Sequence, residues 1–306
     1  MHILAWALQI LFVPLLAPLG VGIINKIKAK VQRRQGAGLL QPYRDIRKLL
    51  HKDEVISEDA SFIFNIAPYI VFGITLIVGA SVPLFTSVIH LPSSDLITVV
   101  LLLATGTFFL ALAGMDTGSS FGGFGSSREM TLSALVEGLF IASILVLVIL
   151  HRTTNLYLIA GSVHLDYADL IAVALAGVSF FIVLLAETNR FPFDNVDTHL
   201  ELTMIHEAML LEYSGKKLAL MEWASANKLI IFAAMLVNLY FPVGLASNLQ
   251  FGTIALAITI FIAKLLVVYV AIAVLESVIA KLRFFRLPGL LFTAFILCLI
   301  AIGLVK

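Results

Sequence analysis

Cysteine is almost absent from this chain of 306 residues, which contains only Cys298. A single cysteine cannot build an internal disulfide framework, and it cannot supply the cysteine ligands of a zinc or iron–sulfur site. Cys298 also lies within an apolar run. We therefore expect no disulfide, no metal site and no redox cofactor in this chain.

Charged residues are scarce as well. They make up 13% of the chain, against about 25% in soluble domains. Hydrophobic residues make up 60%, and the mean hydropathy is +1.05. Too few polar side chains remain to cover a globule of this size, which excludes a soluble enzyme, a secreted disulfide scaffold and a disordered chain. A net charge of +1 gives no reason to expect nucleic acid. The composition predicts a polytopic membrane protein.

Long apolar runs are abundant, and eight of them approach the roughly 20 residues that a helix needs to cross the hydrocarbon core. They are continuously apolar without a period of two, which favours helices over barrel strands. No internal repeat is evident, which weighs against inverted-repeat transporter folds. We predict an all-α integral membrane protein with a single domain, 1–306, whose spans lie near 3–25, 62–87, 96–115, 130–150, 167–187, 222–245, 252–276 and 287–305.

The basic residues fix the predicted orientation. Sixteen of the twenty Lys and Arg residues fall in the first, third, fifth and seventh loops. Loops rich in Lys and Arg remain in the cytoplasm, so these loops are predicted to be cytoplasmic and both termini to lie outside. The first and fifth loops, 26–61 and 188–221, are long and dense in charge. Long loops of this kind are usually functional, so contacts with partners are expected on the cytoplasmic face.

The first loop contains a short segment, 39–51, with an amphipathic pattern. Its apolar residues share one helical face, and its charged residues share the other, which predicts a helix lying in the membrane interface. The apolar set is Leu39, Leu40, Tyr43, Ile46, Leu49 and Leu50, and the charged set is Arg44, Asp45, Arg47 and Lys48. Two interpretations remain open: an anchor that binds anionic lipid, and a docking surface for a partner.

The fifth loop mixes acidic and apolar residues in equal measure. Its acids are Glu187, Asp194, Asp197, Glu201, Glu207 and Glu212. Residues 199–212 are predicted to be helical, and the apolar content favours burial against another protein over a solvated acidic loop. Glu187 and Arg190 have the spacing of an i,i+3 ion pair. His199 and His206 share a face, but no HExxH spacing accompanies them, so no metal site is expected.

A glycine-rich stretch, 118–127, follows the third span. It lacks the GK[ST] ending of a phosphate-binding loop and follows a membrane helix rather than a strand. We predict a flexible linker there. Ser and His residues form no pattern that indicates nucleophilic catalysis, so no catalytic residue is assigned.

Ionisable residues within the predicted spans indicate function by default, because charge is costly in lipid. Glu137 follows Glu129 by eight residues on the same helical face, and Lys264 lies mid-span, where it needs a carboxylate or water. Residues near span ends can instead extend to the interface; these are Glu187, Glu222, Lys228 and Glu276. Structural ion pairs and a proton pathway that runs from the acidic loop into the bundle are both consistent with this pattern.

Two motifs carry a resemblance to a known family. AETNRFPFD at 186–194, followed by EYSG at 212–215, resembles the fifth cytoplasmic loop of the complex I subunit 1 family, and RRQGAGLLQPYRDIRKLL at 33–50 resembles its first loop. The stretch 197–215 departs from complex I. Together with the stretch 114–130, it looks most like the membrane subunit of group 4 energy-converting [NiFe] hydrogenases, the group that includes hydrogenase-4 component C and formate hydrogenlyase.

The resemblance implies a membrane anchor and coupling subunit in a bacterial or archaeal cytoplasmic (inner) membrane. It implies large and small hydrogenase subunits and Fe–S subunits on the cytoplasmic face, with the [NiFe] and Fe–S centres in those partners, and antiporter-like membrane subunits beside it in the bilayer. Translocation of protons or Na⁺ would be linked to the redox chemistry.

The predicted site residues fall into two sets. The proton path or coupling set is Glu129, Glu137, Glu187, Asp194, Asp197, Glu201, Glu207, Glu212 and Lys264. The set for docking the soluble arm is Arg33, Arg34, Gln41, Arg44, Asp45, Lys48, Arg190, His199 and His206. Two alternatives remain: a quinone-chamber subunit of a NADH:quinone oxidoreductase-type complex, and a stand-alone secondary transporter.

Overall fold

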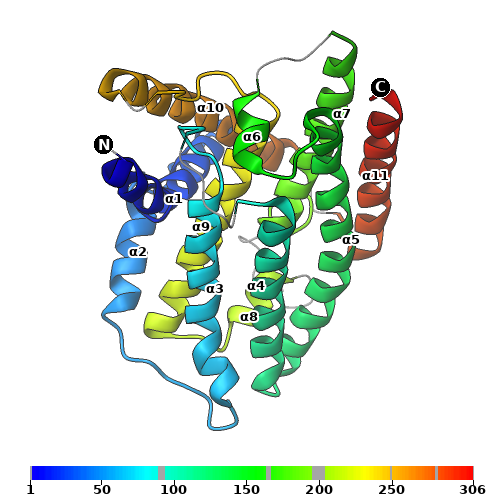
Figure 1. Ribbon diagram of the computed structural model, residues 1–306. Coiled ribbons are helices and arrows are strands. Elements are labelled where there is room, and N and C mark those ends of the chain that lie inside the picture. The colour runs from blue at the N-terminus through cyan, green and yellow to red at the C-terminus, as the bar shows by residue number, and fades with distance from the viewer. Residues whose placement is uncertain are drawn as a thin grey trace.

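Helices make up most of the chain in the computed structural model (Figure 1). The structure describes residues 2–88, 94–162, 167–194, 204–248, 250–279 and 282–305, and the side chains of 2–6, 167 and 168 are not included. The helices are α1 His2–Val31, α2 Gln41–Leu50, α3 Phe62–Ser81, α4 Leu96–Asp116, α5 Ser120–His151, α6 Leu156–Gly161, α7 Tyr167–Glu187, α8 His206–Leu210, α9 Gly215–Leu239, α10 Phe251–Val278 and α11 Leu287–Leu304. A 3₁₀ turn, Phe284–Arg286, precedes α11.

Eight of these helices are long and apolar enough to cross a membrane: α1, α3, α4, α5, α7, α9, α10 and α11. The described residues contain no strand, only two isolated β-bridges. The predicted all-α bundle of eight transmembrane helices is therefore confirmed, and the chain is a multi-pass membrane protein.

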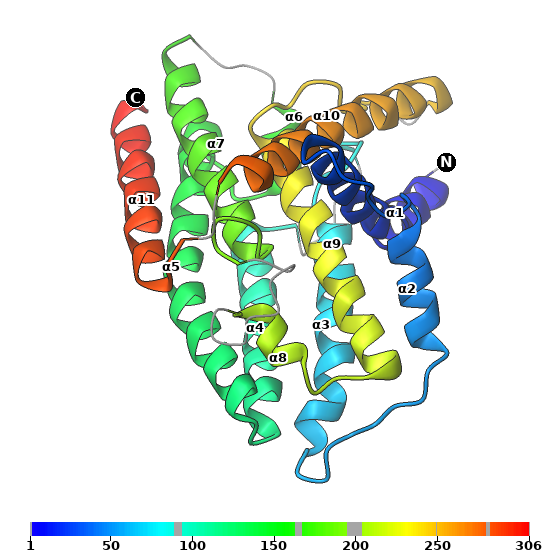
Figure 2. The same ribbon diagram turned by 180° about the vertical axis from the view of Figure 1, so that it is seen from behind.

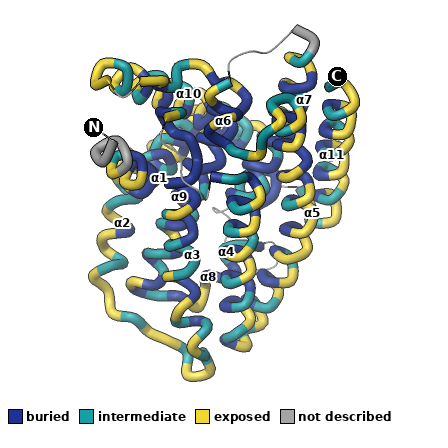
Figure 3. The backbone as a smooth tube through the Cα atoms, viewed as in Figure 1, coloured by how far each residue is buried: buried dark blue, intermediate teal, exposed yellow. Residues whose placement is uncertain are grey.

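Helix α9 lies at the centre of the bundle. In its most apolar stretch 72% of the residues are buried, against 28% in the corresponding stretch of α11. Figures 1 and 2 show α3, α4, α5 and α9 running roughly side by side, whereas α10 lies across one end of them. The outer helices present many exposed residues (Figure 3). Apolar side chains on these outer faces fit a lipid surrounding.

Aromatic side chains pack α9 against α5 and α7. The rings of Phe140 on α5, Phe180 on α7 and Phe232 on α9 lie with centroids 5.3 to 6.1 Å apart. Tyr240 lies 5.3 Å from Phe180, and its hydroxyl donates to the backbone oxygen of Ser143 at 2.9 Å. All of these rings are buried. Tilted aromatic pairs of this kind add about 0.5–1.5 kcal/mol each beyond their buried area.

The second span is shorter than predicted, because α3 ends at Ser81 and residues 82–86 continue as buried non-helical chain. Pro83 explains the end, since the residue before a proline is driven to extended geometry, and Val82 has φ −93° and ψ 136°. Side chains of Gln9, Tyr157 and Asn238 donate to the carbonyl oxygens there. Irregular backbone is tolerated at membrane depth when protein groups bond it in this way.

The glycine-rich stretch is helical, so the predicted flexible linker is wrong. Helix α5 begins at Ser120, after a turn in which Gly118 has φ +64°. A Cβ on Gly122 would lie 2.1 Å from the carbonyl oxygen of Gly114 in α4, and one on Gly125 would lie 2.8 Å from the Ile205 oxygen. The glycines therefore serve close approach of α5 to α4 and to the segment before α8.

This packing predicts opposite results for two adjacent glycines. We expect Gly122→Ala to destabilise the protein by about 1–3 kcal/mol, because its methyl group would overlap the α4 backbone. Gly123 has nothing within 4 Å of its Cβ position. Gly123→Ala should therefore be neutral or stabilise by up to about 1 kcal/mol through helix propensity. Thermal unfolding in detergent measures both, and equal effects would contradict the packing.

Helix α2 corresponds to the predicted amphipathic segment of the first loop. Its buried residue is Ile46, and it packs on α1 and α9. Figures 1 and 2 show it beside α9. Leu39 and Leu40 precede the helix and are exposed. The apolar face of α2 therefore has a partner within the chain at Ile46, and its predicted place in the membrane interface stays a prediction.

Candidate functional site

A large cavity opens between α1, α2, α8, α9 and residues 188–194, on the side of the bundle predicted to face the cytoplasm. Its volume is about 320 Å³. Asp45, Asp194, Glu207 and Glu222 contribute four carboxyl groups to its lining, and Arg190 contributes one cation. The remaining lining residues are Pro18, Val21, Asn25, Pro42, Ile46, Thr188, Asn189, His206, Leu210, Ser225 and Ala226. Acidic groups therefore dominate the charge of this cavity.

Two smaller cavities lie next to the large cavity and share lining residues with it. The inner cavity, about 40 Å³, is lined by Glu129, Glu187 and Lys228 among mainly apolar residues of α3, α4 and α9. A third cavity of about 10 Å³ lies against Glu129 and Ser133. A cavity needs a volume of roughly 10–15 Å³ to hold one water molecule. The inner cavity can therefore hold water, and the third is close to the size of one molecule.

Shared lining residues connect the three cavities. Asn189, His206 and Ser225 line both the large and the inner cavity. Glu129, Glu187 and Asn189 line both the inner and the third. A row of polar groups thus leads from the large cavity to the buried carboxyl group of Glu129.

Glu187 pairs with Lys228 of α9, with 2.6 Å between carboxylate oxygen and Nζ. The predicted pair of Glu187 with Arg190 is wrong. Helix α7 ends at Glu187, and Asn189 has φ +52°, so the helical i,i+3 geometry is lost between the two residues. Lys228 also does not extend to the interface, because only 18% of its side chain is exposed.

Arg190 instead pairs with Glu276 of α10 at 3.2 Å, and Lys28 of α1 lies 3.4 Å from the other oxygen of the same carboxylate. The Glu276 side chain is 2% exposed, so the expectation that it extends to the interface is wrong. This triad joins α1, α10 and the segment after α7. Lys28 also lies over the ring of Phe191, 5.4 Å from its centroid.

Glu129 and Glu137 lie two turns apart on α5 in different environments. Glu129 is 8% exposed and lies in the fields of Lys228, Glu187 and Asp194. Glu137 is partly buried and accepts a hydrogen bond from the Ser133 hydroxyl at 2.8 Å. The inner and third cavities reach Glu129, and neither is lined by Glu137.

Asp194 orders the fifth loop from within. It is 2% exposed, and its Oδ2 accepts the backbone N–H groups of Ile205 at 3.1 Å and His206 at 3.2 Å. Helix α8 is only five residues long, shorter than the predicted helix 199–212. Predicted site residues Asp197, His199 and Glu201 lie outside the described residues.

Most of the apolar part of the fifth loop is buried in this chain's own core. Its buried members are Met204, Ile205, Ala208, Met209 and Leu210, whereas Leu211, which belongs to the same predicted surface, is exposed. The prediction that this surface is buried against another protein is therefore wrong for the buried residues. They pack between α4 and α5, where the glycines of α5 leave room.

His206 lines the large cavity and the inner cavity, in contrast to its predicted role in docking a partner. Neither ring nitrogen has a hydrogen-bond partner among the described residues. Burial lowers the pKa of His206 to about 4, because the cation is poorly solvated there; nearby Lys228 adds to the effect and Asp194 opposes it. The imidazole is therefore neutral at pH 7. No group of His, Cys, Asp and Glu in the described chain is arranged to hold a metal.

Glu207, the next residue, has the opposite shift. Burial raises its pKa to about 7, and the negative charges of Glu222 and Asp194 contribute to the rise. This carboxyl group exchanges its proton near neutral pH at the wall of the large cavity.

The shift of Glu207 predicts a pH-dependent stability. Between its ordinary pKa of 4.5 and about 7, the folded chain binds a proton that the unfolded chain has released, so this group's contribution to stability falls as pH rises. We expect Glu207→Gln to gain Tm relative to wild type on going from about pH 5 to about pH 8. Tm measured at both pH values in detergent tests this, and a constant difference would contradict it.

The predicted docking residues of the first loop are exposed. Arg33, Arg34, Arg44, Asp45 and Lys48 all face the surface, and Gln41 donates to Asp45 at 2.8 Å. Glu212 of the fifth loop is exposed too, and it lines none of the three cavities. Among the described residues, the first loop therefore offers a partner a dense group of exposed charges.

Lys264 lies apart from this site. Its Nζ donates to the backbone oxygens of Phe241 at 2.6 Å and Val237 at 3.3 Å, and to the Asn238 side chain at 3.4 Å. These acceptors lie at the carboxyl end of α9, where a cation is stabilised by the helix dipole. Among the described residues Lys264 therefore caps a helix, in place of the predicted pairing with a carboxylate.

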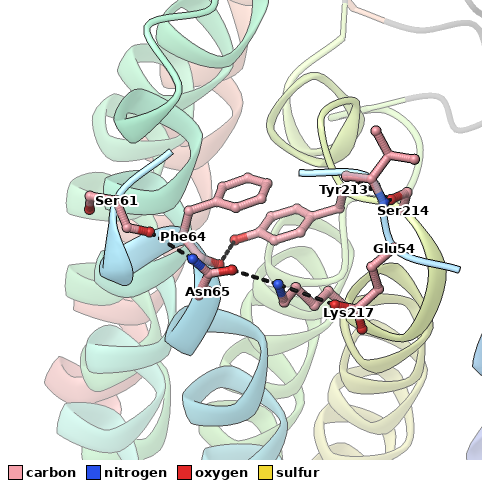
Figure 4. Close-up of polar contacts among 8 residues, drawn as sticks. Glu54, Ser61, Phe64, Asn65, Tyr213, Ser214 and Lys217 are labelled. Carbon is pink, nitrogen blue, oxygen red and sulfur yellow. Dashed lines mark hydrogen bonds and ion pairs between the residues drawn. The ribbon is translucent and has the colours of Figure 1, made fainter. Parts of the chain in front are cut away.

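A polar clasp that the sequence did not predict joins the first loop to the start of α9 (Figure 4). Lys217 lies 3.2 Å from Glu54 and donates to Asn65 at 2.5 Å. Tyr213 donates to the Phe64 backbone oxygen at 3.0 Å, and the two rings stack with centroids 4.0 Å apart. The clasp holds the two long loops against each other at the starts of α3 and α9.

The geometry of the chain agrees with its membership of a known family. The NADH dehydrogenase family profile matches residues 4–305, and the chain belongs to this family.

Among curated proteins, the chain is 33% identical to hydrogenase-4 component C of Escherichia coli (strain K12) over 294 residues, covering 96% of this chain and 92% of that protein. It is 34% identical to formate hydrogenlyase subunit 4 of the same strain, covering 96% of each chain. It is 28% identical to NADH-quinone oxidoreductase subunit 8 of Rhodothermus marinus, covering 71% of this chain and 66% of that protein.

A solved structure shares the fold. It is that of the membrane-bound sulfane sulfur reductase, an archaeal respiratory membrane complex, and one of its chains superposes with a TM-score of 0.85. The match covers 100% of this chain and 99% of that chain, at 20% identity. The resemblance found in the two loop motifs is confirmed by the family and the curated relatives.

Proposed function

We propose that this chain is the membrane anchor and coupling subunit of a multisubunit membrane-bound hydrogenase of the formate hydrogenlyase type. In this proposal a soluble arm with the [NiFe] and Fe–S centres docks on the cytoplasmic face, and antiporter-like subunits adjoin the chain in the bacterial or archaeal cytoplasmic membrane. The chain itself carries no redox cofactor, and it links the arm's chemistry to translocation of protons or Na⁺.

The observation that carries the proposal is the row of linked cavities. The large cavity begins where the two long loops meet, and its acidic lining attracts protons from the medium. Asn189, His206 and Ser225 connect it to the inner cavity, where Glu187, Lys228 and Glu129 meet. Buried carboxyl groups beside water can take up and release protons without a metal or cofactor in this chain.

Docking of the arm is supported by the first loop. Its exposed basic residues, Arg33, Arg34, Arg44 and Lys48, belong to the same loop as Asp45, which lines the large cavity. A partner with an acidic surface would fit there, beside the mouth of the cavity. A redox reaction in that partner could then change the charge at the cavity mouth.

The lining of the large cavity favours water and protons over a quinone. Ligand pockets for apolar molecules are lined mainly by hydrophobic and aromatic side chains. The described residues that line this cavity include four carboxylates and no Phe, Tyr or Trp. A stand-alone transporter is the weaker alternative, since the similar curated proteins are named as a component and a subunit of larger enzymes.

Purification tests the docking part of the proposal. The tagged full-length chain, extracted from its own membrane in mild detergent, should bring down hydrophilic subunits, and metal analysis should find nickel and iron in the preparation. A chain that purifies alone and remains stable would support a transporter. Iron without nickel, together with bound quinone, would support the NADH:quinone type.

Inverted membrane vesicles test the coupling part. Hydrogen evolution driven by reduced methyl viologen should move protons across the vesicle membrane, as a pH-sensitive dye reports, and an uncoupler should abolish the signal. Hydrogen evolution at a normal rate without ion movement would contradict the coupling role.

A further inference from the structure

His206 is the one described histidine whose two ring nitrogens are both buried and without a hydrogen-bond partner. A buried polar atom without a hydrogen bond costs about 1–3 kcal/mol. Two such atoms on one ring are expensive unless the cavities beside them supply water. Both ring nitrogens have almost no accessible surface in this conformation, and His206 borders two cavities, so rotation of the ring is what brings a nitrogen to water in either one.

Its position separates two groups of charges. On the side of the large cavity are Asp194, Glu207 and Glu222. On the side of the inner cavity are Glu187 and Lys228. The backbone N–H of His206 donates to Asp194, which holds the start of α8, and with it the ring, at the boundary.

We propose that His206 is the proton relay that joins the large cavity to the inner cavity. The inference rests on the proposed function and specifies the residue through which its protons pass. Of the three described residues that line both cavities, His206 is the only one whose side chain can bind and release a proton. Asn189 and Ser225 can only hold water in place.

The step conserves atoms and charge. A proton from water in the large cavity binds to the ring nitrogen that carries none, which forms an imidazolium. The proton on the other nitrogen then leaves to water in the inner cavity and continues to Glu187. One proton moves, only N–H and O–H bonds form and break, and no electrons are transferred. Reorientation of the neutral side chain then returns an N–H group to the side of the inner cavity and a bare nitrogen to the side of the large cavity, so no proton moves back.

The surroundings favour passage of the proton over its retention. Lys228 and burial both disfavour the imidazolium, so the cation does not accumulate. A relay needs a group that is protonated briefly and returns to neutral, and a buried imidazole beside an ammonium meets this condition.

Chemical rescue in vesicles containing the whole complex tests the relay. In His206→Ala and His206→Gln we expect proton translocation per hydrogen evolved to fall by about 10-fold or more, normalised to the amount of assembled complex. Imidazole added to the medium should restore translocation in His206→Ala, because the deleted ring leaves space next to an open cavity. His51→Ala is the matched control, since His51 is exposed and lines none of the cavities.

Each outcome decides the point. Normal translocation in either His206 variant overturns the relay, and so does a loss in His206→Ala that imidazole leaves unrestored, since a purely structural role gives that result. Where His206→Ala fails to assemble, the glutamine variant decides, because it keeps the donor and acceptor but cannot carry a proton. Glu187→Gln distinguishes failure of the relay from failure of the proposed function. If Glu187→Gln loses translocation while the His206 variants keep it, the relay is wrong and the proposed function stands.

Discussion

Glu276→Gln should destabilise the protein by about 3–5 kcal/mol, the usual cost of removing one member of a buried ion pair. In the part of the chain that the structure describes, the Glu276 carboxylate contacts both Lys28 and Arg190, and its own side chain is 2% exposed. Glutamine would keep the shape and remove the negative charge that these two largely buried cations share. For a chain of this size, this corresponds to a fall in Tm on the order of 10 °C.

A double-mutant cycle sharpens this test. Arg190→Gln removes one of the two cations, so the double variant Arg190→Gln, Glu276→Gln should be less destabilised than the sum of the single variants. Glu58→Gln, at an exposed position, serves as the control and should stay within about 0.5 kcal/mol of wild type. Thermal unfolding of the detergent-solubilised chain measures all four. Additive effects would contradict a shared buried network.

Glu187→Gln should lower proton translocation per hydrogen evolved by about 10-fold or more, equivalent to about 1.4 kcal/mol or more in the coupled step. Glutamine cannot accept a proton, and it leaves Lys228 without the carboxylate that lies 2.6 Å from its Nζ. An uncompensated cation in the inner cavity repels protons that approach Glu129. Both effects act in the same direction.

The charge argument makes a second variant informative. In the double variant Glu187→Gln, Lys228→Met the repulsive cation is gone but the proton acceptor is still missing. Translocation should therefore recover only in part, whereas Glu187→Asp should retain much of it. The vesicle assay with reduced methyl viologen measures these ratios, with Glu58→Gln as control. Wild-type translocation in Glu187→Gln would remove this residue from the route.

The spans are predictable because their length and apolar content depend on local sequence alone. The errors lie where a neighbouring helix decides the outcome. Glycines at 122 and 125 suggest a linker because glycine favours no regular structure, yet close packing against Gly114 and Ile205 makes them helical. Pro83 falls within a predicted span, and α3 ends before this proline. The carbonyl oxygens of the non-helical chain that follows α3 accept hydrogen bonds from side chains of three other helices, which the local sequence does not reveal.

The site is predictable by residue type and only partly by arrangement. Glu129, Glu187, Asp194 and Glu207 are all assigned to a proton route from the sequence, and all four line the connected cavities. Their partners cannot be inferred, because charge pairs such as Glu187 with Lys228 join helices that are distant in sequence. His206 is assigned to the docking surface, since a histidine among acids and apolar residues gives no sign of which side faces a cavity.

The most direct test of the proposed route is whether water from the cytoplasmic side reaches Ser225, which lines both main cavities. The chain's only cysteine, Cys298, is fully buried, so Ser225→Cys adds a single reactive thiol to a nearly silent background. Ser143→Cys is the matched control, because Ser143 is 0% exposed and lines none of the three cavities.

In inverted vesicles a small, membrane-impermeant methanethiosulfonate reagent should modify Ser225→Cys and leave Cys298 and Ser143→Cys unmodified, as mass spectrometry of the labelled chain would show. A thiol at 225 that is as unreactive as Cys298 would show that the cavities are closed to the cytoplasm, which would contradict the proposed route.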